Sequence, residues 1–420
     1  MSYLKISYNR WLKKEGVPMR IGIIGGGAAG MAAALAAAEC EQNSVVLMER
    51  QARLGRKLSA TGNGRCNLSN LHASAGGYNG DDPLFSKYAI DKFGPEATLE
   101  WFSSLGLYTV AEPSGRIYPY SDQANSVVDV LRFALERDNI QVLMDFEVLK
   151  VKKDGCHFIV TARDQTLEFD RLIIACGGLA GTKLGGTMSG YKLLRGFGHK
   201  CTKLRPALVQ VKTGWPGIYA LKGVRANCHA RITCDGALHR ESTGEIQFTE
   251  FGLSGPVIYE ISRDACQGGG DWECILDFLP DVSYDALLSM LLRRRDTKLT
   301  AEDLFTGILH NRLGRVLIKE ADIRGNTPIA QLRDGAMREA AGYAKSFILT
   351  LSEPLGMDAA QVTAGGIVTN EFDPETMESR LVSGLYACGE VLDVDGDCGG
   401  YNLQWAWSSG RLAGKCAGKE

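Results

Sequence analysis

Three glycines, Gly25, Gly27 and Gly30, have the spacing GxGxxG between a short apolar run and an alanine-rich run. In a strand–turn–helix unit, the first glycine permits a tight turn, the second lets the backbone approach a pyrophosphate, and the third lets the helix pack on the strand. Glu49 ends the next apolar run, where a carboxylate can bind a ribose diol and would repel a 2′-phosphate. The pattern predicts a βαβ unit that binds an unphosphorylated dinucleotide at the helix N-terminus. A glycine-rich turn without a ligand is the alternative, and Glu49 weighs against it.

The C-terminal stretch 385–410 has the same order of features. A strand-like run leads into acids and glycines and then into a helix that contains Trp405 and Trp407. We expect both tryptophans to be packing groups, because they lie beyond the first turn of that helix. The two helix N-termini are expected to hold the two ends of one extended ligand. The glycine spacing alone does not separate NAD from FAD.

Composition limits the classes of partner. The 420 residues exceed one hydrophobic core, so two or three domains are expected. With 47 basic and 49 acidic residues, the net charge of -2 favours a small-molecule substrate and disfavours nucleic acid or an anionic membrane. The 12 cysteines contain no CxxC and the 6 histidines show no metal-ligand spacing, so we expect no metal site. Reduced thiols in apolar surroundings fit a cytoplasmic protein.

Residues 21–38 are uncharged and follow basic residues, as in a signal peptide or membrane span. The glycines of the turn and the second apolar run, 44–49, favour a buried βαβ unit instead. No membrane insertion is expected.

The rest of the chain divides by pattern. Strands are predicted at about 20–24 and 44–49, with helices at 29–41, 95–105 and 122–138. The stretch 53–70 is predicted to be a long polar loop, and three short alternating runs between 146 and 169 predict an antiparallel meander. The segment 201–354 is first strand-like and then helical, which indicates a second domain inserted between 1–200 and 355–420. Its basic run, Arg293–Arg295, is predicted to be a solvated helix face.

Six blocks in order carry a family resemblance: GGGAAG (25–30), GRKLSATGNGRCNLSN (55–70), ACGG (175–178), FGLSGP (251–256), VTAGGI (362–367) and GEVLDVDGDCGGYNLQWAWSSG (389–410). Along essentially the whole chain the sequence resembles the HI0933-like (BaiN-type) family of FAD-dependent oxidoreductases, which is also associated with aminoacetone oxidases. The resemblance implies an α/β fold. Its Rossmann-like FAD-binding domain, of the two-dinucleotide-binding flavoprotein type, is interrupted by a β-barrel-like and helical insert.

The resemblance also implies FAD contacts along the first and last domain segments. Lys57 and Arg65 would neutralise the diphosphate or polarise the flavin, Glu390 would approach the ribityl region, and the helix that starts at Gly400 would face the flavin pyrimidine. Val148 falls where such folds present a strand backbone to the adenine. The implied cofactor-binding residues are Gly25, Gly27, Ala28, Ala29, Gly30, Glu49, Arg50, Lys57, Gly62, Gly64, Arg65, Cys66, Asn67, Val148, Ala175, Cys176, Gly177, Gly389, Glu390, Gly400, Tyr401, Asn402 and Leu403.

Two positions depart from the usual family pattern. Threonine is commoner where Cys176 and Cys398 stand, so individual hydroxyl hydrogen bonds are lost there. Neither cysteine has a partner thiol or an adjacent histidine in the sequence, and a reactive role is therefore disfavoured.

The expected reaction is reduction of a carbon–carbon double bond conjugated to a carbonyl, in a hydrophobic steroid or bile-acid-like substrate. Because only one complete dinucleotide fingerprint is present, NADH or NADPH would dock without its own GxGxxG, or electrons would come from another donor. Tyr401, Arg65 and Glu250 are the candidates for polarising or protonating the substrate. In the alternative reading, Glu250 is a loop acid and Arg65 only a cofactor ligand.

Two other functions remain open. An amine oxidase of the aminoacetone type would release hydrogen peroxide, and a non-catalytic flavin-binding protein would act as a sensor or as a partner in RNA modification. The balanced charge disfavours RNA.

Overall fold

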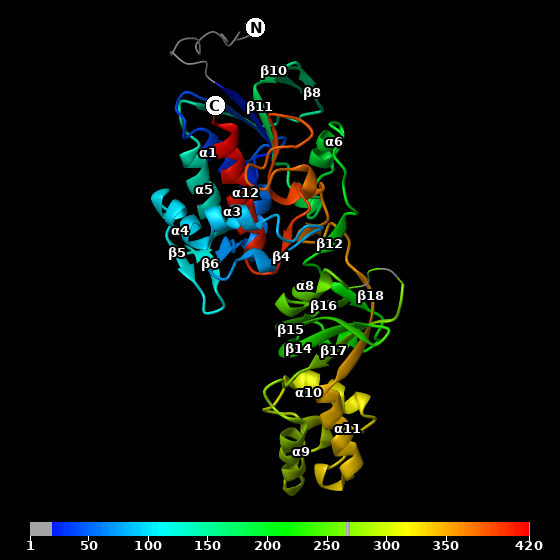
Figure 1. The fold of residues 1–420 in the computed structure, drawn as a ribbon. Helices are drawn as coiled ribbons and strands as arrows, with labels where there is room; N and C mark the ends of the chain where they lie inside the picture. The colour runs from blue at the N-terminus through cyan, green and yellow to red at the C-terminus, as the bar shows by residue number, and fades with distance from the viewer. Residues whose placement is uncertain (1–18, 266, 268, 420) are drawn as a thin grey trace, which may run out of the picture. The chain divides into compact units, whose positions relative to one another are not determined.

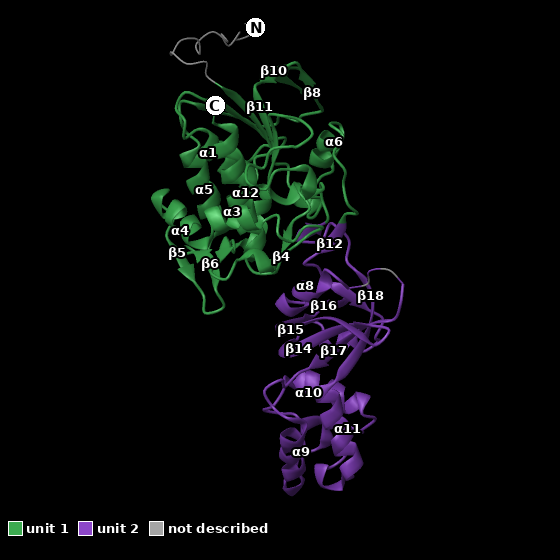
Figure 2. Cartoon of the chain, in the orientation of Figure 1, with its two compact units in different colours: residues 1–204, 365–420 green, residues 205–364 purple. Residues whose placement is uncertain are grey.

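The chain forms two compact units (Figure 1, Figure 2). The computed structural model describes residues 19–265, 267 and 269–419. Unit 1 joins the chain up to Leu204 to the segment from Gly365 onward, and unit 2 is Arg205–Ala364. The second boundary lies later than the expected 354, because strands β18 (Phe347–Pro354) and β19 (Val362–Ala364) both pair with other strands of unit 2.

The centre of unit 1 is a five-stranded parallel sheet with the order β20-β11-β1-β2-β7. Most residues of its central strands are buried, as expected for a parallel sheet covered on both faces. The strand order places the C-terminal ends of β1, β11 and β20 side by side, at the carboxyl ends of the sheet's strands. The five strands are β1 (Arg20–Ile24), β2 (Ser44–Met48), β7 (Ile140–Leu143), β11 (Arg171–Ile174) and β20 (Leu385–Ala387).

Helices α1 (Ala28–Ala37) and α12 (Tyr401–Ala417) pack side by side and run in the same direction (Figure 1). A Cβ on Gly410 would lie 2.4 Å from the carbonyl oxygen of Ala29, and one on Gly414 would lie 2.2 Å from that of Ala33. This register places the start of α12 eight residues ahead of the start of α1, or about 12 Å at 1.5 Å per residue. The two N-termini are therefore staggered along one direction.

The βαβ prediction for residues 20–49 is confirmed, and α1 is buried except at Ala28. The helix ends at Ala37 rather than 41, and the side-chain amide of Asn43 donates to the carbonyl oxygen of Ala37 at 3.1 Å. Among the described residues, no helix is both long and apolar enough to cross a membrane.

Several smaller elements complete unit 1. The meander prediction is confirmed by the antiparallel sheet β10-β9-β8. The stretch 53–70 is not a loop throughout, because Gly55 takes a left-handed φ of 66° and starts helix α2, which leads into the 3₁₀ helix η1 (Thr61–Gly64). The remaining elements are α2 (Arg56–Ala60), α3 (Lys87–Lys92), α4 (Pro95–Ser104), α5 (Ala124–Ala134), α6 (Ser189–Arg195), β3 (Ser69–Asn70), β4 (Tyr78–Asn79), β5 (Thr109–Ala111), β6 (Arg116–Pro119), β8 (Lys150–Asp154), β9 (His157–Thr161), β10 (Thr166–Phe169) and β21 (Asp395–Gly396).

Unit 2 contains a closed barrel with the strand order β13-β16-β15-β14-β17-β18. Buried residues of its helices share one hydrophobic core with those of the barrel. Alternate residues of β14, such as Cys228, Ala230 and Ile232, are buried, which is the pattern of a packed barrel interior. The elements are β12 (Arg205–Ala207), β13 (Val211–Thr213), β14 (Arg225–Cys234), β15 (Ala237–Phe248), β16 (Gly252–Ser254), β17 (Trp272–Asp277), α7 (Ile218–Leu221), α8 (Pro256–Ser262), α9 (Tyr284–Leu292), α10 (Asn311–Glu320) and α11 (Asp334–Lys345).

The basic run in unit 2 is not simply a solvated face, which corrects the prediction from sequence. The Arg294 guanidinium donates to the carbonyl oxygens of Asp303 and Thr306, and Arg295 donates to that of Leu332. Backbone carbonyl oxygens therefore engage two of the three cations, while Arg293 remains exposed.

Candidate active site

The turn between β1 and α1 has the shape that the glycine spacing predicts. Gly25 has a φ of 112°, and a Cβ there would lie 2.4 Å from the carbonyl oxygen of Ala175. At Gly27 a Cβ would meet no protein atom within 4 Å, so open space lies beside the N-terminus of α1. The first orphan amides of this helix can therefore be approached by a ligand.

Glu49 is held by backbone donors at the end of β2. Its Oε2 accepts from the Gly26 amide at 2.7 Å, and its Oε1 accepts from the Gln51 amide at 2.8 Å. The next residue, Arg50, donates to the carbonyl oxygen of Gly185 at 3.0 Å. These contacts fix the carboxylate next to the glycine turn.

The segment after β11 borders the same turn. The Ala175 amide donates to the carbonyl oxygen of Ile24 at 2.8 Å. Burial, reinforced by the charge of Glu49, raises the pKa of the Cys176 thiol to about 12. The thiol is therefore protonated at neutral pH, which argues against a nucleophilic role. Space for a ligand lies beside Gly177, where a Cβ would meet nothing within 4 Å.

A salt bridge joins the loop after β20 to helix α2. The Nζ of Lys57 lies 2.8 Å from Oε2 of Glu390, and the two side chains are 31% and 19% exposed. The preceding Gly389 amide donates to Oγ of Ser409 on α12 at 3.0 Å. The acidic loop is therefore anchored on two sides.

The stretch from η1 to β3 has unusual backbone geometry. Gly62, Asn63, Gly64 and Cys66 all have positive φ values, between 56° and 86°. Burial raises the pKa of the Cys66 thiol to about 12. Within the part of the chain that the structure describes, the buried Oδ1 of Asn67 has no hydrogen-bond partner. Such an orphaned acceptor indicates a missing ligand or water.

Arg65 extends from this stretch across the ring of Tyr118. Its guanidinium carbon lies 4.0 Å from the ring centroid, and it is paired with Asp122 and with Glu112, the latter at 3.2 Å. The hydrogen bond with Asp122 is the main cause of the raised pKa of Arg65. The charge of this cation is therefore largely engaged by protein carboxylates.

Side chains fix the turn before α12. Asn402 accepts from the Gly396 amide and donates to its carbonyl oxygen, each at 2.8 Å, and Asn70 donates to the carbonyl oxygen of Gly399 at 2.8 Å. The backbone amides of Asn402 and Leu403 have no acceptor within the described ranges. The first turn of α12 therefore presents donors that can bind a partly negative group.

A family model described as the HI0933-like protein Rossmann domain matches residues 19–416. The chain belongs to the HI0933-like family. The α/β fold with a Rossmann-type domain and a barrel-containing insert is confirmed for this HI0933-like chain.

The HI0933-like chain is 40% identical over 404 residues to the 3-dehydro-bile acid delta(4,6)-reductase of Clostridium scindens, covering 95% of this chain and 98% of the relative. It is 33% identical over 394 residues to the ribosomal RNA dihydrouridine synthase of Escherichia coli, covering 92% and 95%. Among solved structures, a 3-ketosteroid delta1-dehydrogenase from Sterolibacterium denitrificans has a TM-score of 0.48 at 14% identity, covering 96% of this chain and all of that chain.

The structure gathers most residues named from the sequence in unit 1 of the HI0933-like chain. Val148 is buried in the segment between β7 and β8, rather than in a strand. Tyr401 starts α12, and its hydroxyl donates to the carbonyl oxygen of His72 at 3.4 Å. Glu250 belongs to unit 2, where it is paired with Lys222. Both tryptophans of α12 are buried, as predicted, and their ring N–H groups donate to backbone carbonyl oxygens.

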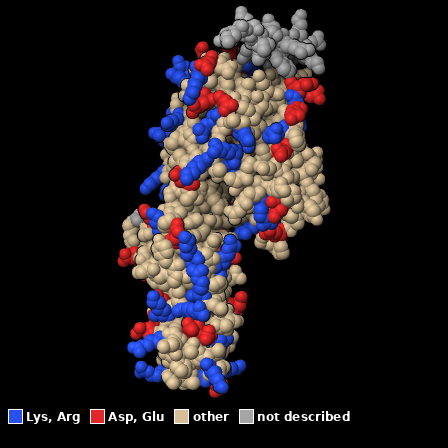
Figure 3. Space-filling model, turned by 180° about the vertical axis from the view of Figure 1, so that it is seen from behind, with Lys and Arg blue, Asp and Glu red and all other residues tan. Residues whose placement is uncertain are grey.

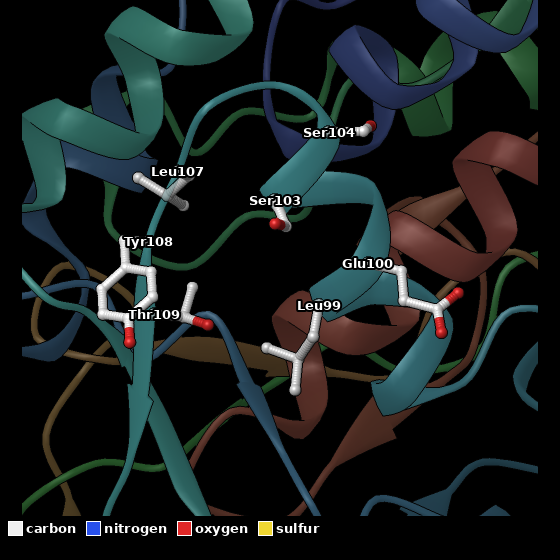
Figure 4. Close-up of a pocket in the computed structure, with 7 residues that line it drawn as sticks. All are labelled: Leu99, Glu100, Ser103, Ser104, Leu107, Tyr108 and Thr109. Atoms are coloured by element: carbon white, nitrogen blue, oxygen red, sulfur yellow. The ribbon is translucent and has the colours of Figure 1, made fainter.

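Two residues at this site were not found from the sequence. Arg116 and Tyr118 stand on β6, a strand of four residues whose two-residue alternation is too short to be distinctive. A shallow hollow elsewhere contains no residue named from the sequence, so it does not mark the predicted site (Figure 4). It is lined by Leu99, Glu100, Ser103, Ser104, Leu107, Tyr108 and Thr109.

Proposed function

We propose that this HI0933-like chain is an FAD-dependent oxidoreductase that reduces a carbon–carbon double bond conjugated to a carbonyl, in a hydrophobic substrate of the steroid or bile-acid type. The observation that carries the proposal is the register of α1 and α12. Their N-termini point the same way with a stagger of about 12 Å, which suits an elongated ligand with a pyrophosphate at one end and an acceptor-rich ring at the other.

The residues at the site fit FAD. Open space lies beside Gly27, where a pyrophosphate would approach α1, and the orphaned Oδ1 of Asn67 lies close to Gly400 at the start of α12. Glu49 is fixed where a ribose diol would bind. The Glu49 carboxylate can accept from ribose hydroxyls, and Asn67 Oδ1 can accept from a ring N–H. These groups therefore match a dinucleotide at one end and a ring that carries an N–H at the other.

Each part of the site has a task in this proposal. The amides of α1 would hold the pyrophosphate, Glu49 the adenosine ribose, and Ala175–Gly177 the adenosine side, while Glu390 would approach the ribityl chain. The amides of Asn402 and Leu403 would stabilise negative charge on the ring. When bound, FAD supplies hydride chemistry.

The names of the two relatives support the type of bond reduced. A delta(4,6)-reductase acting on a 3-dehydro compound and a dihydrouridine synthase both saturate a carbon–carbon double bond conjugated to a carbonyl. The 40% identity to the former favours the bile-acid type of substrate. Ribosomal RNA is the second candidate substrate, favoured by the 33% identity to the latter.

The balance of charges favours the small molecule. Basic and acidic side chains are interspersed over both units on the face shown in Figure 3, and the net charge is -2. Proteins that hold RNA gather basic residues on the face that contacts phosphates. We propose NADH or NADPH as the electron donor, although only one complete GxGxxG fingerprint is present.

The test uses the purified full-length protein with FAD. Anaerobic addition of NADH or NADPH is expected to bleach the flavin absorbance, and a 3-oxo-Δ4 bile acid is expected to restore it. Restoration by a uridine-containing ribosomal RNA fragment alone would favour the second candidate. Peroxide formed from aminoacetone in air without nicotinamide would favour an oxidase, and no spectral response would favour a sensor. Protein that stays colourless after reconstitution with FAD contradicts the whole proposal.

A further inference from the structure

Strand β6 presents two polar side chains on one face. Arg116 and Tyr118 are two residues apart, so both point to the same side of the strand, while Ile117 between them is fully buried. Tyr118 is only 7% exposed, and its ring lies under the guanidinium of Arg65. Its position is therefore fixed by packing and by a cation–π contact.

This face of β6 adjoins the start of α12. Asn70 on β3 is paired with Arg116 and donates to the carbonyl oxygen of Gly399 at 2.8 Å. The Nε of Arg116 would lie 3.0 Å from a Cβ on Gly399. Tyr118 is near enough to Cys398 for the two groups to interact electrostatically. Both side chains therefore lie beside the helix end that the proposed function assigns to the flavin ring.

Tyr118 differs from the other tyrosines at this end of unit 1. The hydroxyl of Tyr78 donates to the carbonyl oxygen of Tyr401 at 3.1 Å, and that of Tyr401 donates to His72. The Tyr118 hydroxyl has no hydrogen-bond partner among the residues described. Its oxygen is not fully buried, because it is absent from the set of fully buried polar atoms that lack a partner. Its proton is therefore available to a ligand.

The two arginines beside Tyr118 also differ. Arg65 is paired with Asp122 and Glu112. The side chain of Arg116 has no carboxylate or carbonyl partner in the described ranges, although the residue is only partly exposed. A half-buried guanidinium without a protein acceptor is suited to a ligand oxygen that gains negative charge.

We propose that Tyr118 is the proton donor of the reduction and that Arg116 binds the carbonyl oxygen of the substrate. This inference rests on the proposed function and names two catalytic residues for it. Tyr118 is in the correct protonation state, because burial raises its pKa and the charge of Glu112 adds to that effect, against the opposing charges of Arg116 and Arg65. The phenol therefore keeps its proton at neutral pH.

The electron pair and the proton come from different donors. In the proposed function, the β carbon receives the two electrons as a hydride from the reduced flavin. This addition leaves an enolate whose oxygen faces Arg116. The O–H bond of Tyr118 then breaks and its proton forms a C–H bond at the α carbon, while the carbonyl double bond re-forms. The phenolate regains a proton from water, and no electron is transferred in this step.

The test compares Tyr118→Phe and Arg116→Gln with the control Tyr120→Phe, because Tyr120 is 68% exposed. All three variants are expected to keep the wild-type ratio of FAD to protein and the wild-type rate of flavin reduction by NAD(P)H. In Tyr118→Phe, reoxidation of the flavin by a 3-oxo-Δ4 bile acid is expected to slow by roughly 100-fold or more. In Arg116→Gln, the dissociation constant of that bile acid, read from the flavin spectrum, is expected to rise about 10-fold.

A second measurement is independent of rate. In deuterium oxide, the wild-type enzyme is expected to place deuterium on one face of the α carbon, and Tyr118→Phe to place it on both. If Tyr118→Phe is reoxidised at the wild-type rate with the wild-type stereochemistry, Tyr118 is not the donor, and an unchanged dissociation constant in Arg116→Gln excludes the carbonyl contact. If the wild-type flavin is bleached but no enone restores it, the proposed function fails together with this inference.

Discussion

Gly410 of α12 lies directly against Ala29 of α1. A Cβ on Gly410 would lie 2.4 Å from the carbonyl oxygen of Ala29, and 3.1 Å from its Cα. The absence of a side chain thus lets two backbones touch at the N-terminal end of α1. This contact, repeated one turn later at Gly414, fixes how far α12 extends beyond α1 and therefore the distance between the two proposed anion-binding ends.

Replacing Gly410 by valine is expected to push the two helices apart. Overpacking a buried contact costs about 1–3 kcal/mol, so Tm should fall by roughly 2–12 °C. Because the stagger of the N-termini changes as well, FAD should dissociate more readily. Differential scanning calorimetry and the ratio of flavin to protein absorbance after gel filtration measure the two effects.

A matched glycine serves as the control for Gly410. Gly342 lies inside helix α11, where a Cβ would meet nothing within 4 Å. Gly342→Ala is expected to leave Tm unchanged or raise it slightly, since alanine lowers the entropy of the unfolded chain. Equal losses of FAD in both variants would show that the α1–α12 contact does not set the cofactor site.

The Lys57–Glu390 salt bridge is expected to contribute a measurable coupling energy. Both side chains are largely shielded from solvent, at 31% and 19% exposure. A double-mutant cycle with Lys57→Met and Glu390→Gln in the FAD-saturated protein is expected to give a coupling of about 0.5–1 kcal/mol in urea denaturation. The exposed pair Lys87–Asp91 should give less, because its side chains are 57% and 55% exposed. A coupling no larger than in that control would mean that the pair does not anchor the acidic loop.

Local sequence patterns were sufficient for the βαβ unit. The turn at Gly25 and the fixed carboxylate of Glu49 depend on residues within one strand–helix–strand unit, so their roles follow from spacing. The order of strands and then helices in the insert was also predictable from its pattern, whereas its barrel was implied only by the family resemblance. The C-terminal boundary of the second unit was not predictable. Strand β19 has the same apolar pattern as a strand of the parallel sheet, but it pairs with β12 instead.

Long-range pairing decided the rest of the site. Whether Arg65 offers its charge to a ligand depends on Asp122 and Glu112, which lie 57 and 47 positions away. The resemblance implies that Lys57 neutralises the diphosphate or polarises the flavin, yet the carboxylate that it contacts, Glu390, is 333 positions away in sequence. No pattern in a single sequence reports such contacts, and the same limit hid the shared face of Arg116 and Tyr118.

Cys176 is expected to resist alkylation in the native protein. Its folded-state pKa of about 12 exceeds the ordinary value of 9.0, so almost no thiolate is present at pH 8. Cys40 and Cys156 are exposed. Iodoacetamide should therefore alkylate them much faster than it alkylates Cys176. Peptide mass spectrometry with and without urea measures the difference. Labelling of Cys176 at the rate of Cys40 would contradict a protonated thiol.

The pKa of Cys176 also predicts a dependence of stability on alkaline pH. The folded state binds the thiol proton more tightly than the unfolded state, so this contribution is complete below pH 9 and is lost as pH rises from 9 to 12. Cys176→Thr removes the titrating group, so Tm should fall less steeply between pH 8 and 10 in this variant. Parallel slopes for the two proteins would contradict the expected linkage.

His199 is expected to make unit 1 sensitive to mild acid. Its ring is buried between Glu371 and Ser379, with Nδ1 3.0 Å from Oε2 of Glu371 and Nε2 2.9 Å from Oγ of Ser379. The Ser379 hydroxyl accepts from two backbone amides, so it donates its own proton to Nε2, and the neutral ring donates from Nδ1 to Glu371. Burial lowers the pKa of His199 below 6.5, against the opposing effect of Glu371.

The sign of the effect follows from proton binding. Because the unfolded state binds the proton of His199 more tightly, the stability contribution is complete above pH 6.5 and is lost as pH falls below that value towards the folded-state pKa. His199→Phe leaves two polar partners unsatisfied and should lower Tm at pH 7.5, but its deficit relative to the wild type should shrink between pH 6.5 and 5. A constant deficit in His199→Phe across this range would show that His199 does not titrate on unfolding.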